Sequence, residues 1–200
     1  MSLSHVNNYF REVKEIIDII DCQSITSLIS ELINVRAKGG RLFFLGSGGS
    51  AANASHAVND FRKIAGIEAY SPSDNVSELT ARVNDDGWEN SYSDWLGVSN
   101  LNENDALFVF SVGGGDEDLS LSPNIVQALK FAKNKKSKIF GIVGRSGGYT
   151  GKVADVCVRI PTVNPNTVTA HAESFQAVIW HLIVSHPKLK QQEMKWESLG

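Results

Sequence analysis

The sequence predicts an α/β protein, a three-layer α/β/α sandwich built on a parallel sheet. Short and almost continuously apolar runs alternate with longer segments of helical periodicity over residues 38–186. The apolar runs lack the polar alternation of a half-exposed strand, which is typical of parallel strands covered on both faces. Glycine- and serine-rich turns follow two of these runs directly, and ligands bind at that edge of such sheets.

Composition indicates one domain spanning residues 1–200. A hydrophobic content of 42% is enough for a well-packed core, and a net charge of −3 without a basic block argues against nucleic acid as a partner. Cys22 and Cys157 are far apart and match no metal spacing, which indicates a reducing compartment. Because no apolar run reaches the length of a membrane span, we expect a cytoplasmic protein with no membrane partner.

The chain begins with a helical region, residues 4–37, that contains no proline or glycine. Apolar residues recur at helical spacing in two stretches, which predicts two helices broken near residues 21–24. Apolar side chains cover much of each helix surface. One side can therefore pack on the α/β core, and the other can contact a second subunit, which predicts a homo-oligomer.

The remaining elements follow from apolar runs and their punctuation. We expect strands at residues 41–45, within 67–80, and at 106–111, 138–143 and 156–160. Ser122 and Pro123 suit the N-cap and the first position of a helix. The other expected helices span residues 51–64, 76–83, 86–98 and 171–185.

The first glycine turn, Gly46–Ser50, joins an apolar strand to a helix of small residues. Backbone N–H groups freed by the glycines, together with the helix dipole, form a natural seat for an anion. The hydroxyls of Ser47 and Ser50 are suited to ligand contact and equally to capping the turn. Both interpretations stay open at this point.

A second glycine turn follows strand 106–111, where Ser111 and Val112 precede three glycines, 113–115. Three consecutive glycines carry a high entropic cost, so they indicate a close approach to the backbone, with a flexible loop as the alternative. The acidic residues 116–118 are unfavourable neighbours for a phosphate. They can face solvent, pair with a basic group or bind sugar hydroxyls. A third turn, residues 145–149, lies at the same edge.

Two histidine–carboxylate pairs are candidates for chemistry. His56 and Asp60 share one face of a helix, and Glu173 and His181 lie within ~80° of each other on the last helix. Buried carboxylates and imidazoles need partners. The four residues could form a metal site or an acid/base couple. The alternative is a pair of buried networks that fix helix packing.

Four stretches carry a resemblance to a known family: LGSGGSAANASHAVNDF, FVFSVGGG with SPNIVQALKFAK, IFGIVGRSGGYTGKVADVCVRIP, and HAESFQAVIWHLIV. Over most of residues 5–186 the chain resembles sugar isomerase (SIS) domains, and among them the phosphoheptose isomerases. This resemblance implies a flavodoxin-like sandwich and a homotetramer with active sites between subunits.

The resemblance also implies site residues. Asp60, Glu173 and His181 take the catalytic positions, and the zinc site of some members corresponds to His56, Asp60, Glu173 and His181. The expected substrate-binding residues are Ser47, Gly48, Gly49, Ser50, Asn53, Asp85, Ser111, Gly113 and Ser122. The chain departs from the family pattern where Asp60 replaces a glutamate, where Glu173 replaces an amide, and where Val112 and Gly113 replace hydroxyl residues. An acidic insertion, residues 116–121, also precedes Ser122.

The sequence therefore predicts an aldose–ketose isomerase acting on a sugar phosphate, with sedoheptulose 7-phosphate as the expected substrate. Zinc is a candidate cofactor, and no nucleotide cofactor is expected. Two alternatives remain. One is a non-catalytic SIS module that binds a sugar phosphate or a protein partner, as a relative involved in replication initiation does. The other is an SIS enzyme acting on an amino-sugar phosphate.

Overall fold

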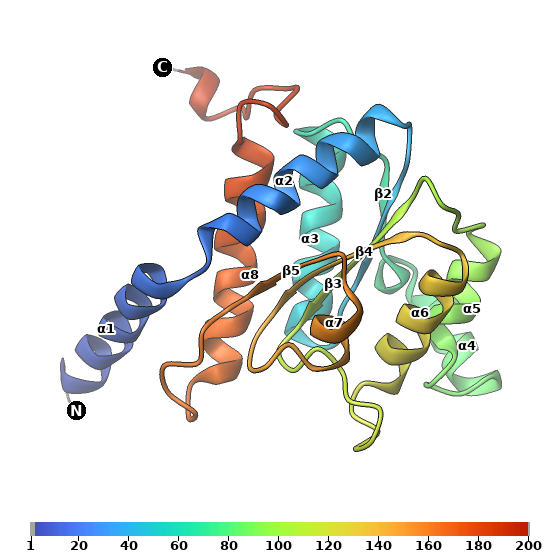
Figure 1. Ribbon diagram of the computed structural model, residues 1–200, viewed down its shortest axis with the longest axis horizontal. Helices are drawn as coiled ribbons and strands as arrows, with labels where there is room; N and C mark the ends of the chain where they lie inside the picture. Colours follow the sequence, from blue (N-terminus) through green and yellow to red (C-terminus); the bar gives the residue numbers. More distant parts are fainter. Residues whose placement is uncertain (1–2, 200) are drawn as a thin grey trace.

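The computed structural model describes residues 3–199 and contains a five-stranded parallel sheet between two layers of helices (Figure 1). The strand order is β2-β1-β3-β4-β5, and every neighbouring pair is parallel. The predicted fold class is confirmed. The strands are β1 (Leu42–Leu45), β2 (Ala69–Tyr70), β3 (Ala106–Ser111), β4 (Lys138–Val143) and β5 (Val156–Arg159).

Helices cover both faces of this sheet (Figure 1). One layer consists of α1 (Leu3–Ile19), α2 (Cys22–Ala37), α3 (Gly49–Lys63) and α8 (Val168–Ser185). The other consists of α4 (Val76–Asp85), α5 (Ser91–Val98), α6 (Pro123–Asn134) and α7 (Gly148–Val153). Short 3₁₀ turns occupy Pro72–Asp74 and Glu197–Leu199. No helix in the described part of the chain has the length and apolar character needed to cross a membrane.

The strands are apolar throughout because each contributes to two cores. Phe44 of β1 stacks on Phe108 of β3, with ring centroids 4.9 Å apart, in the core beneath α3 and α8. The neighbouring residues Phe43 and Leu45 point to the opposite face and pack with α5 and α6. Successive side chains of a strand alternate between faces, so a sheet covered on both sides requires a continuous apolar run.

Some boundaries differ from those that the sequence predicts. The helix expected over residues 86–98 begins only at Ser91, after a turn. Pro123 occupies the first position of α6 as expected, but the side-chain cap expected from Ser122 is wrong. Ser122 has a left-handed backbone with φ of 51°, and its hydroxyl makes no capping bond. A capping side chain needs an extended backbone to reach the first free N–H groups.

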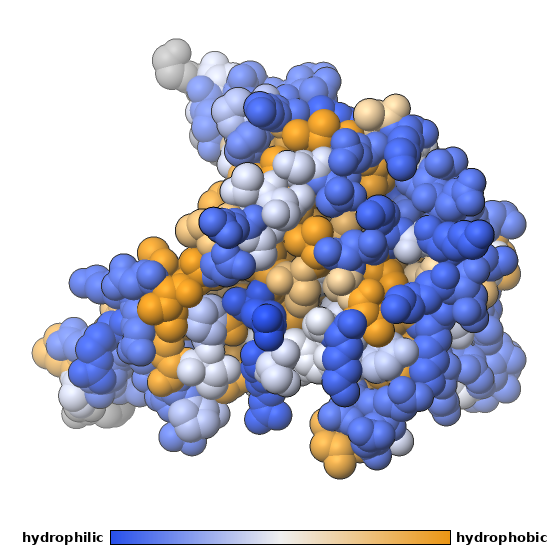
Figure 2. Space-filling view, viewed as in Figure 1, coloured by the Kyte–Doolittle hydropathy of each residue, from blue (hydrophilic) through white to orange (hydrophobic). Residues whose placement is uncertain are grey.

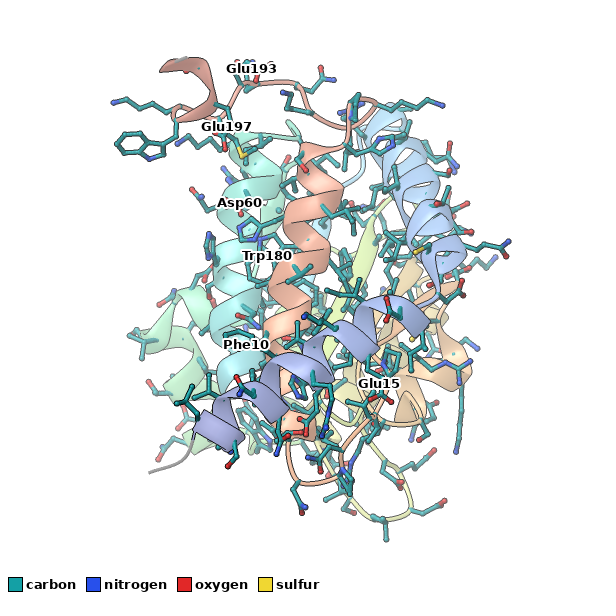
Figure 3. The ribbon with its side chains drawn as sticks, turned by 90° about the vertical axis from the view of Figure 1, so that its left-hand side faces the viewer. Phe10, Glu15, Asp60, Trp180, Glu193 and Glu197 are labelled. Carbon is teal, nitrogen blue, oxygen red and sulfur yellow. The ribbon has the colours of Figure 1, made fainter. Side chains whose placement is uncertain are left out.

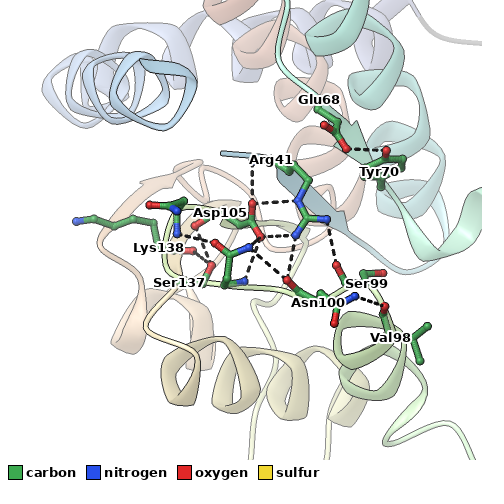
Figure 4. Close-up of polar contacts among 11 residues, drawn as sticks. Arg41, Glu68, Tyr70, Val98, Ser99, Asn100, Asp105, Ser137 and Lys138 are labelled. Carbon is green, nitrogen blue, oxygen red and sulfur yellow. Dashed lines mark hydrogen bonds and ion pairs between the residues drawn. The ribbon is translucent and has the colours of Figure 1, made fainter. Parts of the chain in front are cut away.

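An ion pair holds the amino ends of β1 and β3 together, at the edge opposite the glycine turns (Figure 4). The Arg41 guanidinium donates to both carboxylate oxygens of the buried Asp105, over 3.1 and 2.7 Å. Asp105 also accepts the backbone N–H of Arg41, at 2.9 Å. This hydrogen bonding to Asp105 raises the pKa of Arg41. The pair fixes the relative position of the two strands that carry the first two glycine turns.

Helix α1 extends away from the sandwich and is attached to it by Glu12 (Figure 1). The Glu12 carboxylate is hydrogen-bonded to His171 at 2.8 Å, Asn164 at 2.6 Å and Thr167 at 2.8 Å. These bonds, the one to His171 first, lower the pKa of Glu12 from 4.5 to about 2. A carboxylate on α1 thereby ties this helix to the start of α8.

Much of the remaining surface of α1 is apolar. Figure 2 shows hydrophobic residues along the projecting helix, and Figure 3 labels one of its residues, Phe10. The exposed fractions are 79% for Leu3, 50% for Val6 and 59% for Phe10. Ile17 and Ile19 are also more than half exposed, at 56% and 57%. This side of α1 is uncovered in the single chain, and its contact with a second subunit stays a prediction.

We predict that replacing Glu12 by Gln lowers thermal stability at neutral pH and that this loss fades in acid. The folded-state pKa of Glu12 lies below its unfolded value, so its stabilisation is full above pH 4.5 and disappears as the pH falls toward 2. Melting temperatures at pH 7, 4 and 3 measure this, since the last two values lie between the unfolded and folded pKa values of Glu12. Glu15→Gln, on the same helix, is the control and should match the wild type. An equal deficit of Glu12→Gln at every pH would contradict the assignment.

Candidate functional site

The pair His56 and Asp60 on α3 meets His181 of the adjacent helix α8. Asp60 Oδ2 lies 3.5 Å from His56 Nε2 and 3.3 Å from His181 Nε2. The Asp60 side chain is only 9% exposed, whereas the two imidazoles are 56% and 49% exposed. A buried carboxylate therefore lies behind two rings that solutes can reach. Figure 3 shows Asp60 between the two helices.

Asp60 is held by donors as well as by packing. The indole N–H of Trp180 donates to Oδ2 over 3.0 Å, and the Asn59 amide donates to Oδ1 over 3.0 Å. The His56 ring packs edge-on against Trp180, with centroids 5.2 Å apart, and against His181 at 5.4 Å. The spacing of apolar residues places Trp180 in the core but does not show this bond. The signal that could have revealed it is the need of a buried indole N–H for an acceptor.

The three residues form a group that could hold a metal ion, with all ligand atoms within 4.8 Å of one another. Tetrahedral zinc ligands at about 2.0–2.2 Å from the ion lie roughly 3.3–3.5 Å apart. The two separations from Asp60 match this spacing, the whole group spans up to 4.8 Å, and two imidazoles with one carboxylate are a common donor set for catalytic zinc. The residues present therefore fit a zinc ion.

Glu173, the expected fourth member, does not belong to this group. Its carboxylate lies against the backbone of Gly49 at the start of α3, where any side chain at position 49 would collide with it. Glu173 is eight residues before His181, a distance of roughly 12 Å along a helix. Glu173 and His181 lie on the same side of α8, but the rotamer of Glu173 directs its carboxylate to the first glycine turn.

The polar residues of the first turn are engaged with α8. Asn53 donates to the Glu173 carbonyl over 2.9 Å and to the side chain of Gln176 over 2.8 Å. Gln176 in turn donates to the hydroxyl of Ser50 over 3.1 Å, and both residues are buried. Gln176 was not among the expected site residues. The sequence does contain a signal for it: Gln176 is a polar residue within an apolar, buried helix, one turn after Glu173, and a buried amide needs hydrogen-bond partners.

The turn itself is shaped by close contacts. A side chain at Gly46 would collide with the Ser50 backbone, and the Tyr92 hydroxyl donates to the Gly46 carbonyl over 2.7 Å. Burial raises the pKa of Tyr92, which keeps this donor protonated. Ser47 is partly buried and its hydroxyl has no partner among the described residues, while Gly48 and Gly49 are exposed. The turn is thus rigid and open on one side.

The second glycine turn packs against the third. Gly114 has a φ of 76°, and a side chain there would collide with the carbonyl of Gly147. Thr150 donates two hydrogen bonds to the Gly114 carbonyl, one from its backbone N–H over 2.9 Å and one from its hydroxyl over 2.7 Å. The close approach predicted from the three glycines is therefore an approach of protein backbone. Ser111 is buried, and its hydroxyl accepts the Gly114 N–H over 3.0 Å.

A cavity of about 800 Å³ opens at the carboxyl edge of the sheet. Gly113 and Glu173 are the expected site residues that line it; the other lining residues are His5, Tyr9, Val112, Arg145, Pro165, Asn166, Thr167, Val168, Thr169 and Ala170. Asp85 is exposed near the end of α4, where its carboxylate accepts from Asn84, and neither Asp85 nor Ser122 lines this cavity.

The structure is an α/β sandwich with a cavity beyond the carboxyl edge of its parallel sheet, which is the edge where folds of this class commonly bind small ligands. Residues 8–144 match the model of the SIS domain family, and the chain belongs to this family.

Relatives and solved structures agree with this membership. The chain is 29% identical over 192 residues to phosphoheptose isomerase 2 of Campylobacter jejuni, covering 90% of this chain and 89% of that protein. It is 31% identical to a phosphoheptose isomerase of Burkholderia pseudomallei, covering 74% and 72%. The fold matches that of a phosphoheptose isomerase from Francisella tularensis with a TM-score of 0.79 and 22% identity, covering 92% and 96% of the chains. The resemblance to SIS domains and phosphoheptose isomerases is thereby confirmed.

Proposed function

We propose that the protein is a sugar-phosphate isomerase that interconverts sedoheptulose 7-phosphate and an aldoheptose 7-phosphate. The observation that carries this proposal is the group His56, Asp60 and His181, in which a buried carboxylate orients two accessible imidazoles. Relatives called phosphoheptose isomerases, at 29–31% identity over most of the chain, support the same reaction class.

The reaction needs proton transfers and no net oxidation. A base takes a proton from the carbon beside the carbonyl, which gives an enediol, and a proton then returns to the former carbonyl carbon. His181 moves the proton between the two oxygens, since its half-exposed ring can reach a ligand. Asp60 and Glu173 are the candidate bases. Asp60 contacts the imidazoles, and Glu173 lines the cavity.

Zinc is the proposed metal, with His56, Asp60 and His181 as its ligands. When bound, the ion would polarise the substrate oxygens as a Lewis acid. Trp180 would then orient the Asp60 ligand through its N–H bond, as partners of metal ligands commonly do.

The exposed apolar side of α1 supports the proposal of a homotetramer. Val178 and Leu182 of α8, 53% and 46% exposed, add apolar surface that a second copy of the chain would cover. His5 and Tyr9 of α1 line the cavity. A second subunit packed on α1 would therefore lie close to the cavity.

We predict that His181→Asn and Asp60→Asn each lower kcat for sedoheptulose 7-phosphate by about 10²–10⁴-fold, the usual contribution of a general acid or base. Both variants should keep a wild-type circular dichroism spectrum, because His181 is half exposed and Asn preserves the shape of Asp60. Glu173→Gln separates the two candidate bases, since a decrease of the same size would assign proton removal to Glu173 and a small decrease would leave it with Asp60. His186→Asn, at the end of the same helix, is the control and should retain activity.

Near-native turnover in both the His181 and Asp60 variants would contradict this mechanism. A wild-type protein that binds the sugar phosphate without converting it would favour the non-catalytic module instead.

We further predict that the purified protein takes up one zinc ion per chain and that His56→Asn and Asp60→Asn abolish this uptake. Elemental analysis after dialysis against zinc measures it, with His186→Asn as the control for adventitious binding to a surface imidazole. Equal zinc content in the wild type and the His56 variant would place the metal elsewhere. If wild-type protein takes up no zinc, the group acts by acid/base chemistry alone.

A further inference from the structure

The predicted anion seat at the first glycine turn faces a negative charge in this chain. The carboxylate of Glu173 lies against Gly49, at the amino end of α3. A helix amino end favours a carboxylate as it favours a phosphate, and the Glu173 carboxylate occupies space at this end of α3 that a ligand phosphate would use. A phosphate placed beside it would meet a like charge at short range. The Ser50 hydroxyl next to it is buried and bonded to Gln176.

The second turn offers few donors to the cavity. Val112 and Gly113 line the cavity and carry no hydroxyl groups, and the Ser111 hydroxyl is buried against the Gly114 N–H. Ser122 lies outside the set of lining residues. The part of this turn that faces the cavity therefore offers no side-chain hydroxyl to a phosphate.

Arg145 is the one lysine or arginine among the described residues that line the cavity. It is exposed, and its guanidinium forms no hydrogen bond or ion pair with the described residues. Arg145 follows the end of β4 in a turn closed by the bond from the Gly147 N–H to the Gly144 carbonyl, at 3.0 Å. Its φ of 50° is a backbone conformation that glycine adopts more readily.

The surroundings of Arg145 favour an anion. Residues 168–170, in the first turn of α8, line the same cavity. The Thr167 hydroxyl that could cap this helix is bonded to Glu12 instead. Glu173, the carboxylate among the lining residues, belongs to the second turn of α8 and faces Gly49. The cavity thus has a cationic part at Arg145 and an anionic part at Glu173.

We propose that Arg145 binds the phosphate group of the substrate. The planar guanidinium can donate two parallel hydrogen bonds to a phosphomonoester, and a free arginine in a cavity with few other donors is suited to this role. The inference rests on the proposed function for the identity of the sugar, but the anion site can be tested without turnover. It places the phosphate at the turn after β4.

The test is binding of inorganic phosphate and of sedoheptulose 7-phosphate, measured by titration calorimetry on the full chain. Arg145→Gln should weaken both by about 10- to 100-fold, as expected for loss of a charge-assisted pair, and Arg145→Lys should fall between it and the wild type. Arg159→Gln is the matched control: Arg159 packs beside Gly147 of the same turn but does not line the cavity. Unphosphorylated sedoheptulose should bind wild type and Arg145→Gln alike. In turnover, Arg145→Gln should raise KM more than it lowers kcat.

Wild-type phosphate affinity in Arg145→Gln, or loss of it in Ser50→Ala or Ser111→Ala alone, would overturn the proposal in favour of the glycine–serine turns. A wild-type chain that binds neither anion would overturn it as well. If Arg145→Gln loses phosphate binding while the wild type shows no isomerase activity, the anion site stands and the proposed function fails.

Discussion

The hydrogen bond from Trp180 to Asp60 is the contact on which the candidate active site depends. It joins α8 to α3 inside the protein and leaves a carboxylate buried only because an indole, an amide and two imidazoles surround it. A buried carboxylate without such partners would lower the stability of the fold. The Trp180 hydrogen bond and the two imidazoles together compensate for the burial of Asp60. The stack of Trp180 on Phe110, 5.7 Å between centroids, connects this arrangement to strand β3.

The close packing of the glycine turns determines which residues at the carboxyl edge of the sheet line the cavity. Gly114 and Gly147 allow the turns after β3 and β4 to touch through their backbones, which sets where Gly113 and Arg145 emerge at the edge. The Arg41–Asp105 pair at the far edge fixes the strands that carry the first two turns. The site therefore rests on a rigid frame, and its chemistry is carried by a few side chains placed on that frame.

Much of this arrangement could be predicted from the sequence, because it follows from periodicity. Continuous apolar runs predict the parallel sheet, and the four-residue spacing predicts that His56 and Asp60 share a face. Their meeting with His181 follows from family resemblance. The contact of Glu173 with Gly49 could not be predicted, since spacing defines a helix face but leaves the rotamer open. Arg145 gave only an ordinary turn signal, because its place in the cavity depends on how two loops and α8 pack together.

Hydrogen exchange at the reacting carbon tests the central claim most directly, because it reports proton removal itself. The wild-type protein is incubated with sedoheptulose 7-phosphate in D₂O, and the C1 hydrogens are followed by nuclear magnetic resonance. The account predicts that wild-type protein replaces one C1 hydrogen by deuterium and that His181→Asn and Asp60→Asn slow this greatly. A wild-type protein that binds the ketose phosphate but leaves both C1 hydrogens in place would contradict the account.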